Sequence, residues 1–263
     1  MRRFSMVNCN PSQTPLCSST RLEKGEADAE TPPHYQKLIG CLMYLAVLTR
    51  PEVSHAVSVL NQFNNCCTQL HWKAAKRVLR YLRSTSDNVL KYCKDGCELQ
   101  AFSDADWMSC PMDRKSYTGF VLIIGYGAWE SKKQRSVGLS STESEYVALS
   151  EAGSAGREVK ALHQLISELL PGYPSPTTMH CDNLGTIKVA SNEGRFKKLK
   201  HVDGRYHWIR EAVSNGTISL QHVPSADMVA DVTSSTTPQM YNIYGSTKRG
   251  NVACYINVCV IPN

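Results

Sequence analysis

Acidic side chains recur in the second half of the chain at spacings that suit metal-assisted hydrolysis of a phosphodiester. That chemistry needs several carboxylates converging on two Mg²⁺ ions about 4 Å apart. Because Mg²⁺ keeps most of its bound water, each ion takes only a few protein oxygens. Such acids are expected at strand ends and on an adjacent helix, all facing inward. The acids at positions of this kind are Asp104 with Asp106, Glu143 with Glu145, Asp182, and Asp227 with Asp231.

The first two acids close a strand-like run. Asp104 follows Leu99–Ser103, and Asp106 shares its face because side chains alternate along a strand. Alternation therefore does not choose between them. Both could also end the strand in a turn, where aspartate is common.

The two glutamates lie at the start of a predicted helix. Ser140 and Glu143 have the spacing of a capping box, which gives Glu143 a local structural role. Glu145 lines up with Ala148 on the small apolar face that should pack on the sheet. A carboxylate on a buried face is costly unless it is paired or bound to metal. A cap formed by Thr142 and Glu145 is the structural alternative.

The later acids follow short segments of strand and helix. Asp182 stands between a short predicted strand and a helix, the junction where open α/β sheets bind ligands. It could instead cap that helix, although Asn183 could also do so. Asp227 and Asp231 are one helical turn apart after Ser225, which could cap a short last helix. Asp227 would favour the helix dipole, whereas Asp231 lies deeper in the segment.

The elements that would position these acids form an α/β pattern. We expect strands near 98–104, 117–124, 126–131, 177–181 and 217–223, and helices near 142–169, from 183 onward and near 201–213. Gly125–Gly127 predicts a tight turn between two of the strands. Three strands followed by alternating helices and strands indicate a mixed sheet with an antiparallel hairpin at one edge.

Helical segments precede this pattern. Tyr35–Val47 has helical spacing of apolar residues, and Pro51 suits the first turn of a second helix towards Asn64. A third helix over 70–84 places apolar side chains on one face and cations largely on the other. These cations are Lys73, Lys76, Arg77, Arg80 and Arg83. They would form either a solvated face or a contact for a phosphate backbone.

Composition narrows the class of protein. The chain has 263 residues, a formal net charge of +6 and 42% apolar residues, which suit a basic globular protein. Its 11 cysteines include no C-x-x-C pair, so a zinc finger is not expected. No secretory signal and no run of about 20 apolar residues occurs. We therefore expect an intracellular protein, cytoplasmic or particle-associated, without a membrane partner.

Six short motifs occur in the order in which one family has them. They are Phe102–Trp107, Arg114–Gly119, Leu139–Tyr146, Cys181–Asn183, Lys200–Asp203 with Arg205–His207, and Ala226–Asp231. Together they resemble the ribonuclease H region of copia-type LTR-retrotransposon Pol polyproteins. Upstream motifs resemble the segment that joins the reverse transcriptase of that family to its ribonuclease H. They are Tyr35–Gly40, Leu42–Leu45, Thr49–Pro51 and Ala74–Leu82.

The resemblance implies a fold, an activity and a cofactor. The fold would be α/β and ribonuclease H-like, a mixed five-stranded sheet with flanking helices, preceded by a small helical segment. The activity would be two-metal hydrolysis of the RNA strand of RNA·DNA hybrids, with two Mg²⁺ or Mn²⁺ ions. Matched motif by motif, the resemblance selects one acid from each pair. The catalytic and metal-binding acids would be Asp104, Glu145, Asp182 and Asp231.

Other residues would contact the hybrid or assist the reaction. The expected nucleic-acid-binding residues are Lys73, Arg77, Arg80, Lys197, Lys198, Lys200 and Arg205. Hybrids are recognised through backbone and 2′-hydroxyl contacts, so no base specificity is expected. His222 stands nine residues before Asp231, where cellular ribonucleases H carry a helpful histidine, and would aid product release. We expect Trp107 and Trp129 to be core aromatics.

On this basis the chain divides into four parts. They are an extended or disordered lead-in (1–33), a helical connection remnant (34–95), a ribonuclease H-like domain (96–234) and a divergent tail (235–263). The chain lacks the Asp-Asp polymerase motif, so the reverse transcriptase portion of the same element would be a separate partner. The family continues past its last acid with Leu-Thr-Lys, whereas Val232–Ser235 follows here. This departure supports an alternative function, a catalytically inactive nucleic-acid-binding remnant of the polyprotein.

Overall fold

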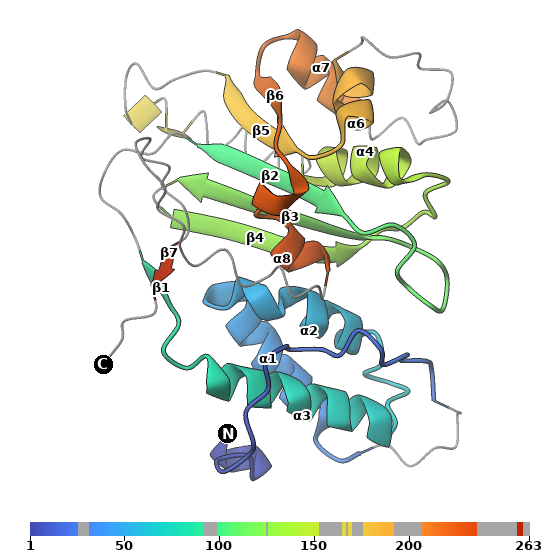
Figure 1. Ribbon diagram of the computed structural model, residues 1–263, viewed down its shortest axis with the longest axis vertical. Coiled ribbons are helices and arrows are strands. Elements are labelled where there is room, and N and C mark those ends of the chain that lie inside the picture. Colours follow the sequence, from blue (N-terminus) through green and yellow to red (C-terminus); the bar gives the residue numbers. More distant parts are fainter. Residues whose placement is uncertain are drawn as a thin grey trace.

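A mixed β-sheet lies between two groups of helices in the computed structural model (Figure 1). The structure describes residues 1–25, 32–91, 99–124, 126–152, 165–166, 168–169, 176–191, 207–235 and 257–259. Among these, no helix combines the length and the apolar character needed to cross a membrane.

The helices of the first third of the chain pack into a layer of their own. They are α1 (Tyr35–Leu48), the 3₁₀ turn η2 (Pro51–Val53), α2 (Ser54–Asn61) and α3 (Gln69–Ser84). Their apolar faces share one core, as the helical spacing predicted. A capping box between Thr68 and His71 starts α3 and satisfies two of its free N–H groups.

Five strands form the main sheet, in the order β4-β3-β2-β5-β6. The strands are β2 (Gln100–Ala105), β3 (Tyr117–Ile124), β4 (Tyr126–Lys133), β5 (Thr177–Cys181) and β6 (Ile218–His222). Strands β2, β3 and β4 pair antiparallel, whereas β5 runs parallel to both β2 and β6. The predicted mixed sheet with an antiparallel hairpin at one edge is therefore confirmed. Because β2, β5 and β6 run the same way, their carboxyl ends meet at one edge of the sheet.

Helices cover both faces of this sheet. On one face α4 (Ser141–Ala152), α6 (Leu184–Ala190) and α7 (Trp208–Ser214) close a core that includes Met179 and Leu149. On the other face lie the 3₁₀ turn η5 (Ser225–Asp227) and α8 (Asp231–Ser234). Flanking helices around a mixed five-stranded sheet are the architecture that the resemblance implied.

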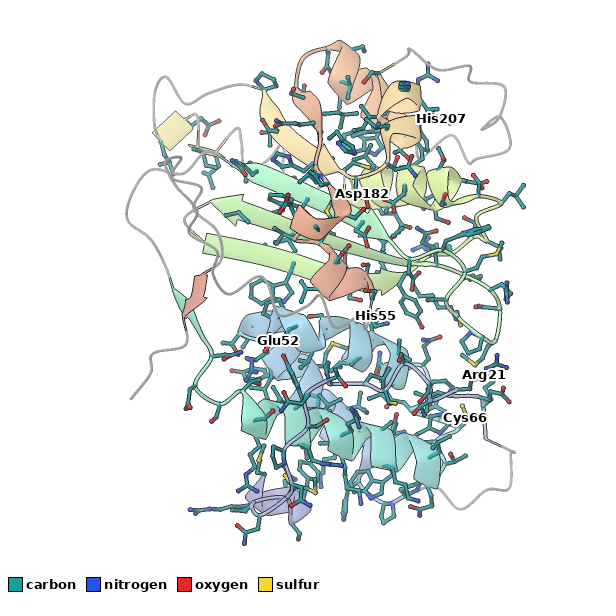
Figure 2. All side chains as sticks on the ribbon, viewed as in Figure 1. Arg21, Glu52, His55, Cys66, Asp182 and His207 are labelled. Atoms are coloured by element: carbon teal, nitrogen blue, oxygen red, sulfur yellow. The ribbon has the colours of Figure 1, made fainter. Side chains whose placement is uncertain are left out.

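The helical layer of α1–α3 packs beneath β4 and α8 (Figure 1). Trp129 of β4 donates from its indole nitrogen to the carbonyl of Ala46 at 2.7 Å. The His55 and Tyr117 rings meet edge to face, with their centroids 4.9 Å apart. Figure 2 shows His55 between the helical layer and the sheet. Polar and aromatic contacts thus join the two parts of the molecule.

Three expectations about helices either need correction or concern residues outside the described part of the chain. The predicted last helix divides into η5 and α8, because Met228 between them has extended backbone angles (φ −74°, ψ 102°) and is buried. The expected helix near 142–169 is described as α4 to Ala152 and at 165–166 and 168–169, and that near 201–213 only from Trp208. The residues in between lie outside the described part.

The lead-in and the tail differ from the simplest expectation. The described part of the lead-in is irregular but packed, because Leu16 and Leu22 are buried in the core of the helical layer. Disorder was therefore the wrong prediction for residues 1–25. In the tail, β7 (Asn257–Cys259) pairs antiparallel with β1 (Val89–Lys91). The four-part division of the chain stays a prediction.

Candidate active site

Four carboxylates from four elements lie together at the edge where β2, β5 and β6 end. Asp104 is in β2, Glu145 is in α4, Asp182 directly follows β5, and Asp231 is the first residue of α8. Asp104 and Glu145 are only 7% and 5% exposed. The structure therefore brings together the four acids that the resemblance selected.

Asp104 and Asp231 form the most closely joined pair. Their carboxyl groups share a hydrogen bond, and the Ser234 hydroxyl also donates to Asp104 Oδ2. Burial is the main cause that raises the pKa of Asp104, and the nearby Asp182 carboxylate raises it further. Burial and then the Asp104 charge raise the pKa of Asp231 to about 8. The pair therefore favours a shared proton when no cation is bound.

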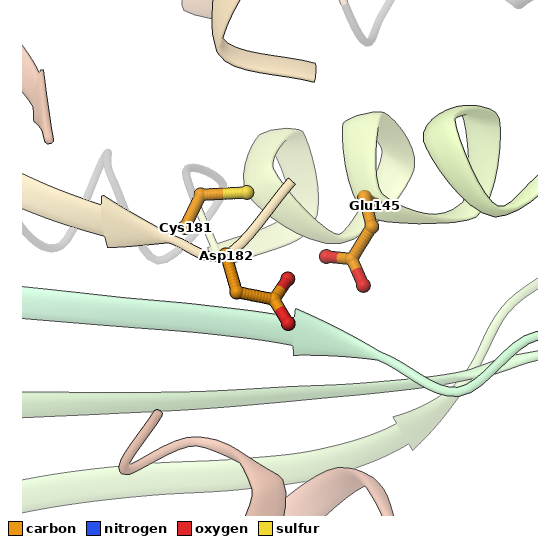
Figure 3. Close-up of side chains that lie close together, drawn as sticks. All are labelled: Glu145, Cys181 and Asp182. Carbon is orange, nitrogen blue, oxygen red and sulfur yellow. The ribbon is translucent and has the colours of Figure 1, made fainter. Parts of the chain in front are cut away.

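Glu145 faces the other acids from α4. Its Oε1 accepts a hydrogen bond from the Ala105 N–H at 3.2 Å, whereas its Oε2 is buried and has no hydrogen-bond partner among the described residues. Burial, followed by the charges of Asp104 and Asp182, raises the pKa of Glu145 well above its usual value. Figure 3 shows the Glu145 and Asp182 carboxyl groups pointing toward one another. A buried carboxylate oxygen without a partner is a position that a cation would stabilise.

Cys181 is a member of this cluster that sequence reasoning did not single out. One ligand atom from each of Glu145, Cys181 and Asp182 lies within 4.8 Å of the others (Figure 3). The thiol is fully buried, and burial raises its pKa. Hard cations such as Mg²⁺ prefer oxygen to sulfur, so the carboxylates are the fitting donors. The only sequence signal for Cys181 is its position next to Asp182 at the end of a strand.

The structure gives Asp106 a role outside this cluster. Its carboxyl group accepts from the Tyr117 N–H and from the Ser109 hydroxyl. It thereby closes the turn after β2, one of the two roles that alternation left open. Burial raises the pKa of Asp106 to about 7.

Glu143 and Asp227 are also separated from the cluster. The Ser140 hydroxyl accepts from the Glu143 N–H at 3.2 Å, and the Glu143 carboxylate accepts from the Leu139 N–H at 3.0 Å. The predicted capping box is thus formed with one change: the Glu143 side chain accepts from the N–H of Leu139 instead of that of Ser140. Asp227 is exposed in η5. Since Glu145 instead contacts Ala105, the alternative role in a cap with Thr142 is wrong.

Asp182 does not cap the helix that follows it, because its neighbour does. Asn183 caps α6, its Oδ1 accepting from the Thr186 N–H at 3.1 Å. Ser225 does not cap the last helix as expected, because its hydroxyl donates to Asp182 Oδ2 at 2.6 Å. His222 is exposed, and its Nε2 lies 3.1 Å from the Asp182 carbonyl oxygen. Both residues therefore hold the segment that carries Asp182.

Two of the expected nucleic-acid contacts have other partners. Arg77 donates to Thr14 Oγ1 at 2.8 Å, and Arg80 donates to the Asn10 carbonyl at 2.7 Å. These arginines bind the lead-in to α3, so the expectation of a free cationic face was wrong for them. Lys73 is exposed, as that expectation requires. The remaining expected contacts lie outside the described residues: Lys197, Lys198, Lys200 and Arg205.

The two tryptophans expected in the core differ from one another. Trp129 is partly buried and packs against the core that Met228 and Ala230 form with the sheet, as expected. Trp107 is 54% exposed, so its assignment to the core was wrong. Its indole nitrogen donates to the Gly138 carbonyl at 3.3 Å, which holds the ring at the surface.

The sheet and the acidic edge define the class of the protein: a ribonuclease H-like α/β fold joined to a helical layer. Known proteins resemble the chain over most of its length. It is 35% identical over 251 residues to the retrovirus-related Pol polyprotein from transposon TNT 1-94 of Nicotiana tabacum, covering 91% of this chain and 18% of that protein. It is 36% identical over 236 residues to the corresponding polyprotein from transposon RE2 of Arabidopsis thaliana, covering 88% and 16%.

Over about nine tenths of its length the chain resembles copia-type retrovirus-related Pol polyproteins from transposons. It spans less than a fifth of the length of the two relatives. No protein-family model matches it. Among solved structures, ribonuclease H1 of Halobacterium salinarum aligns with a TM-score of 0.34 at 17% identity, covering 52% of this chain and 94% of that one.

Proposed function

We propose that the chain is a metal-dependent nuclease of the ribonuclease H type, which hydrolyses the RNA strand of RNA·DNA hybrids with two Mg²⁺ or Mn²⁺ ions. The observation that carries this proposal is the convergence of Asp104, Glu145, Asp182 and Asp231. Within the described part of the chain, none of these acids forms an ion pair with a cationic side chain. Among the described residues, no cationic side chain therefore offsets the mutual repulsion of these acids, and divalent cations would do so.

The donor atoms of the site fit hard divalent cations. Four carboxyl groups provide oxygen ligands, and Glu145 Oε2 is a buried oxygen that a cation would satisfy. Asp104, Glu145, Asp182 and Asp231 would hold the ions. Bound there, the ions would lower the pKa of the attacking water and stabilise the leaving 3′-oxygen.

The chain's own hydrogen bonds orient these ligands in advance. The Ala105 N–H fixes one oxygen of Glu145, Ser225 fixes one oxygen of Asp182, and Ser234 does the same for Asp104. Partners of this kind hold metal-binding side chains in place. A proton shared between Asp104 and Asp231 would have to leave before both carboxylates could bind a cation.

The family suggests where such a substrate would arise. In this proposal the reverse transcriptase portion of the same element makes the RNA·DNA hybrid, and the present chain removes its RNA. The protein would then act in the cytoplasm or in particles of the element.

A cleavage assay with matched variants tests the proposal. The purified chain should cut the RNA strand of a hybrid when Mg²⁺ or Mn²⁺ is present and stop when the ions are chelated. Asp104→Asn should abolish cleavage, whereas Asp227→Asn, at an exposed acid outside the cluster, should retain it. Cleavage that survives Asp104→Asn would contradict the proposed role of that acid.

A catalytically inactive nucleic-acid-binding remnant is the second candidate. The Val232–Ser235 segment departs from the family, and within it Ser234 donates to Asp104, one of the proposed ligands. Hybrid binding without cleavage at any Mg²⁺ or Mn²⁺ concentration would favour this function over the first.

A further inference from the structure

Trp107 is exposed, and a hydrogen bond to the backbone holds its ring at the surface. Its indole is 54% exposed, three residues after Asp104, and its N–H donates to the Gly138 carbonyl at 3.3 Å. Figure 1 shows the loop between β2 and β3 extending past the end of the sheet. An aromatic ring held at the surface is pre-organised for contact with a partner.

The frame that holds Trp107 is shared with the acidic edge, and Ser116 is at its centre. Ser116 Oγ accepts from the Met108 N–H at 3.0 Å, and its carbonyl accepts from the Gln134 N–H at 2.8 Å. The same hydroxyl lies 3.0 Å from the hydroxyl of Ser144, the residue before Glu145. The loops 106–116 and 134–140 and the start of α4 are therefore one connected unit.

Two exposed cations lie on the loops of this unit, and one of them, Arg114, reaches the sulfur of Met108, the residue after Trp107. Arg114 is two residues before Ser116, and Arg135 directly follows Gln134. Both are exposed, and within the described ranges neither pairs with a carboxylate. Their neighbours Lys115 and Lys133, in contrast, both pair with Asp113. Leu139, 68% exposed, directly follows Gly138, whose carbonyl accepts from the Trp107 indole.

We propose that Trp107, Arg114, Arg135 and Leu139, here called the Trp107 surface, bind a nucleic-acid strand beside the acidic edge. An aromatic face packs on sugar or base, and guanidinium groups neutralise phosphates, so this combination fits a polyanionic chain with apolar rings. The inference rests on the proposed function only for the identity of the strand, which would belong to the hybrid. It moves the substrate contact from Arg77 and Arg80, which hold the lead-in, to the loops next to the carboxylates.

Hybrid binding by variants of this surface tests the inference. Affinity for a labelled RNA·DNA hybrid is measured by fluorescence anisotropy at several salt concentrations, with Mg²⁺ and in an Asp104→Asn background that leaves the substrate intact. Trp107→Ala should weaken binding about tenfold without changing the salt dependence, and Trp107→Phe should keep most of the affinity. Arg114→Gln with Arg135→Gln should reduce the slope of log K against log salt by about 2. Tyr44→Ala, at an aromatic residue of α1 that is 68% exposed, is the matched control and should have no effect.

The outcomes separate this inference from the proposed nuclease activity. Affinity and salt slope unchanged in both the Trp107 and the arginine variants would overturn the Trp107 surface, even if the unmodified chain cleaves hybrids. Loss of binding in these variants, together with no cleavage by the unmodified chain, would support the surface and reject the nuclease. Binding of an acidic peptide, but not of the hybrid, would overturn the nucleic-acid assignment.

Discussion

Two buried glutamates, one in the helical layer and one at the acidic edge, have opposite surroundings. Glu52 of η2 and Glu145 of α4 are 1% and 5% exposed, and burial raises the pKa of both. Glu52 accepts from Arg50 Nε at 2.5 Å. Glu145 instead faces Asp104 and Asp182, and no cationic side chain of the described residues pairs with it.

The difference shows what marks a functional acid in this molecule. Burial alone does not, because it is common to both glutamates. A buried acid with its own counter-charge completes a structural contact, whereas buried acids that face one another need an external cation. Substitutions in the two regions should therefore have opposite effects on activity and stability.

The largest expected effect is that of Glu145→Gln on the rate of hybrid cleavage. The amide can still accept from the Ala105 N–H but no longer contributes a charge, so hybrid cleavage should fall by more than about 100-fold. Because repulsion among the acids is also reduced, the metal-free protein should unfold at the same or a higher temperature than the unmodified chain. Glu52→Gln, measured per folded molecule, is the control that should keep its cleavage rate.

Arg50→Ala tests the other buried glutamate, Glu52 of the helical layer. It leaves Glu52 buried without its partner and should reduce the free energy of unfolding by about 3 kcal/mol, measured by urea denaturation. Lys73→Ala, at an exposed cation of the same layer, should change it by less than about 0.5 kcal/mol. Equal stability of the two variants would mean that the Arg50–Glu52 pair does not stabilise the layer.

His55 lies at the boundary between the helical layer and the sheet, and it should make the free energy of unfolding depend on pH. Burial lowers the pKa of His55 to about 4, from an unfolded value of 6.5. The unfolded chain therefore binds this proton first, so the stabilising contribution is complete above pH 6.5 and is lost as the pH falls towards 4. The loss approaches about 3 kcal/mol over this range. His55→Phe keeps an aromatic ring beside Tyr117 and should show a weaker decline in unfolding free energy, and an equally steep decline would contradict the assignment.

A smaller effect distinguishes the neighbours Asp182 and Asn183. Asn183→Ala removes the cap of α6 and should destabilise the protein by about 1 kcal/mol in thermal unfolding. Asp182→Asn should leave stability nearly unchanged and abolish cleavage. A larger stability loss in Asp182→Asn than in Asn183→Ala would reverse the two roles.

The sequence predicted the strands and helices in their order along the chain and the inward face that carries Glu145, because both depend on local periodicity. It could not choose Asp104 over Asp106, since that choice depends on the Tyr117 N–H across the β2–β3 ladder. Local patterns likewise showed the cations of α3 but not the lead-in that binds Arg77 and Arg80, some 60 or 70 residues earlier in the chain. Contacts between distant segments were the part that periodicity and motif spacing do not encode.

Calorimetric titration with Mn²⁺ tests most directly whether the acidic edge is a divalent metal centre. The unmodified chain should bind two ions per molecule, and Glu145→Gln should bind fewer or bind them more weakly. Asp227→Asn, at an exposed acid outside the cluster, should bind as the unmodified chain does. No saturable binding, or the same binding in Glu145→Gln as in the unmodified chain, would contradict the account.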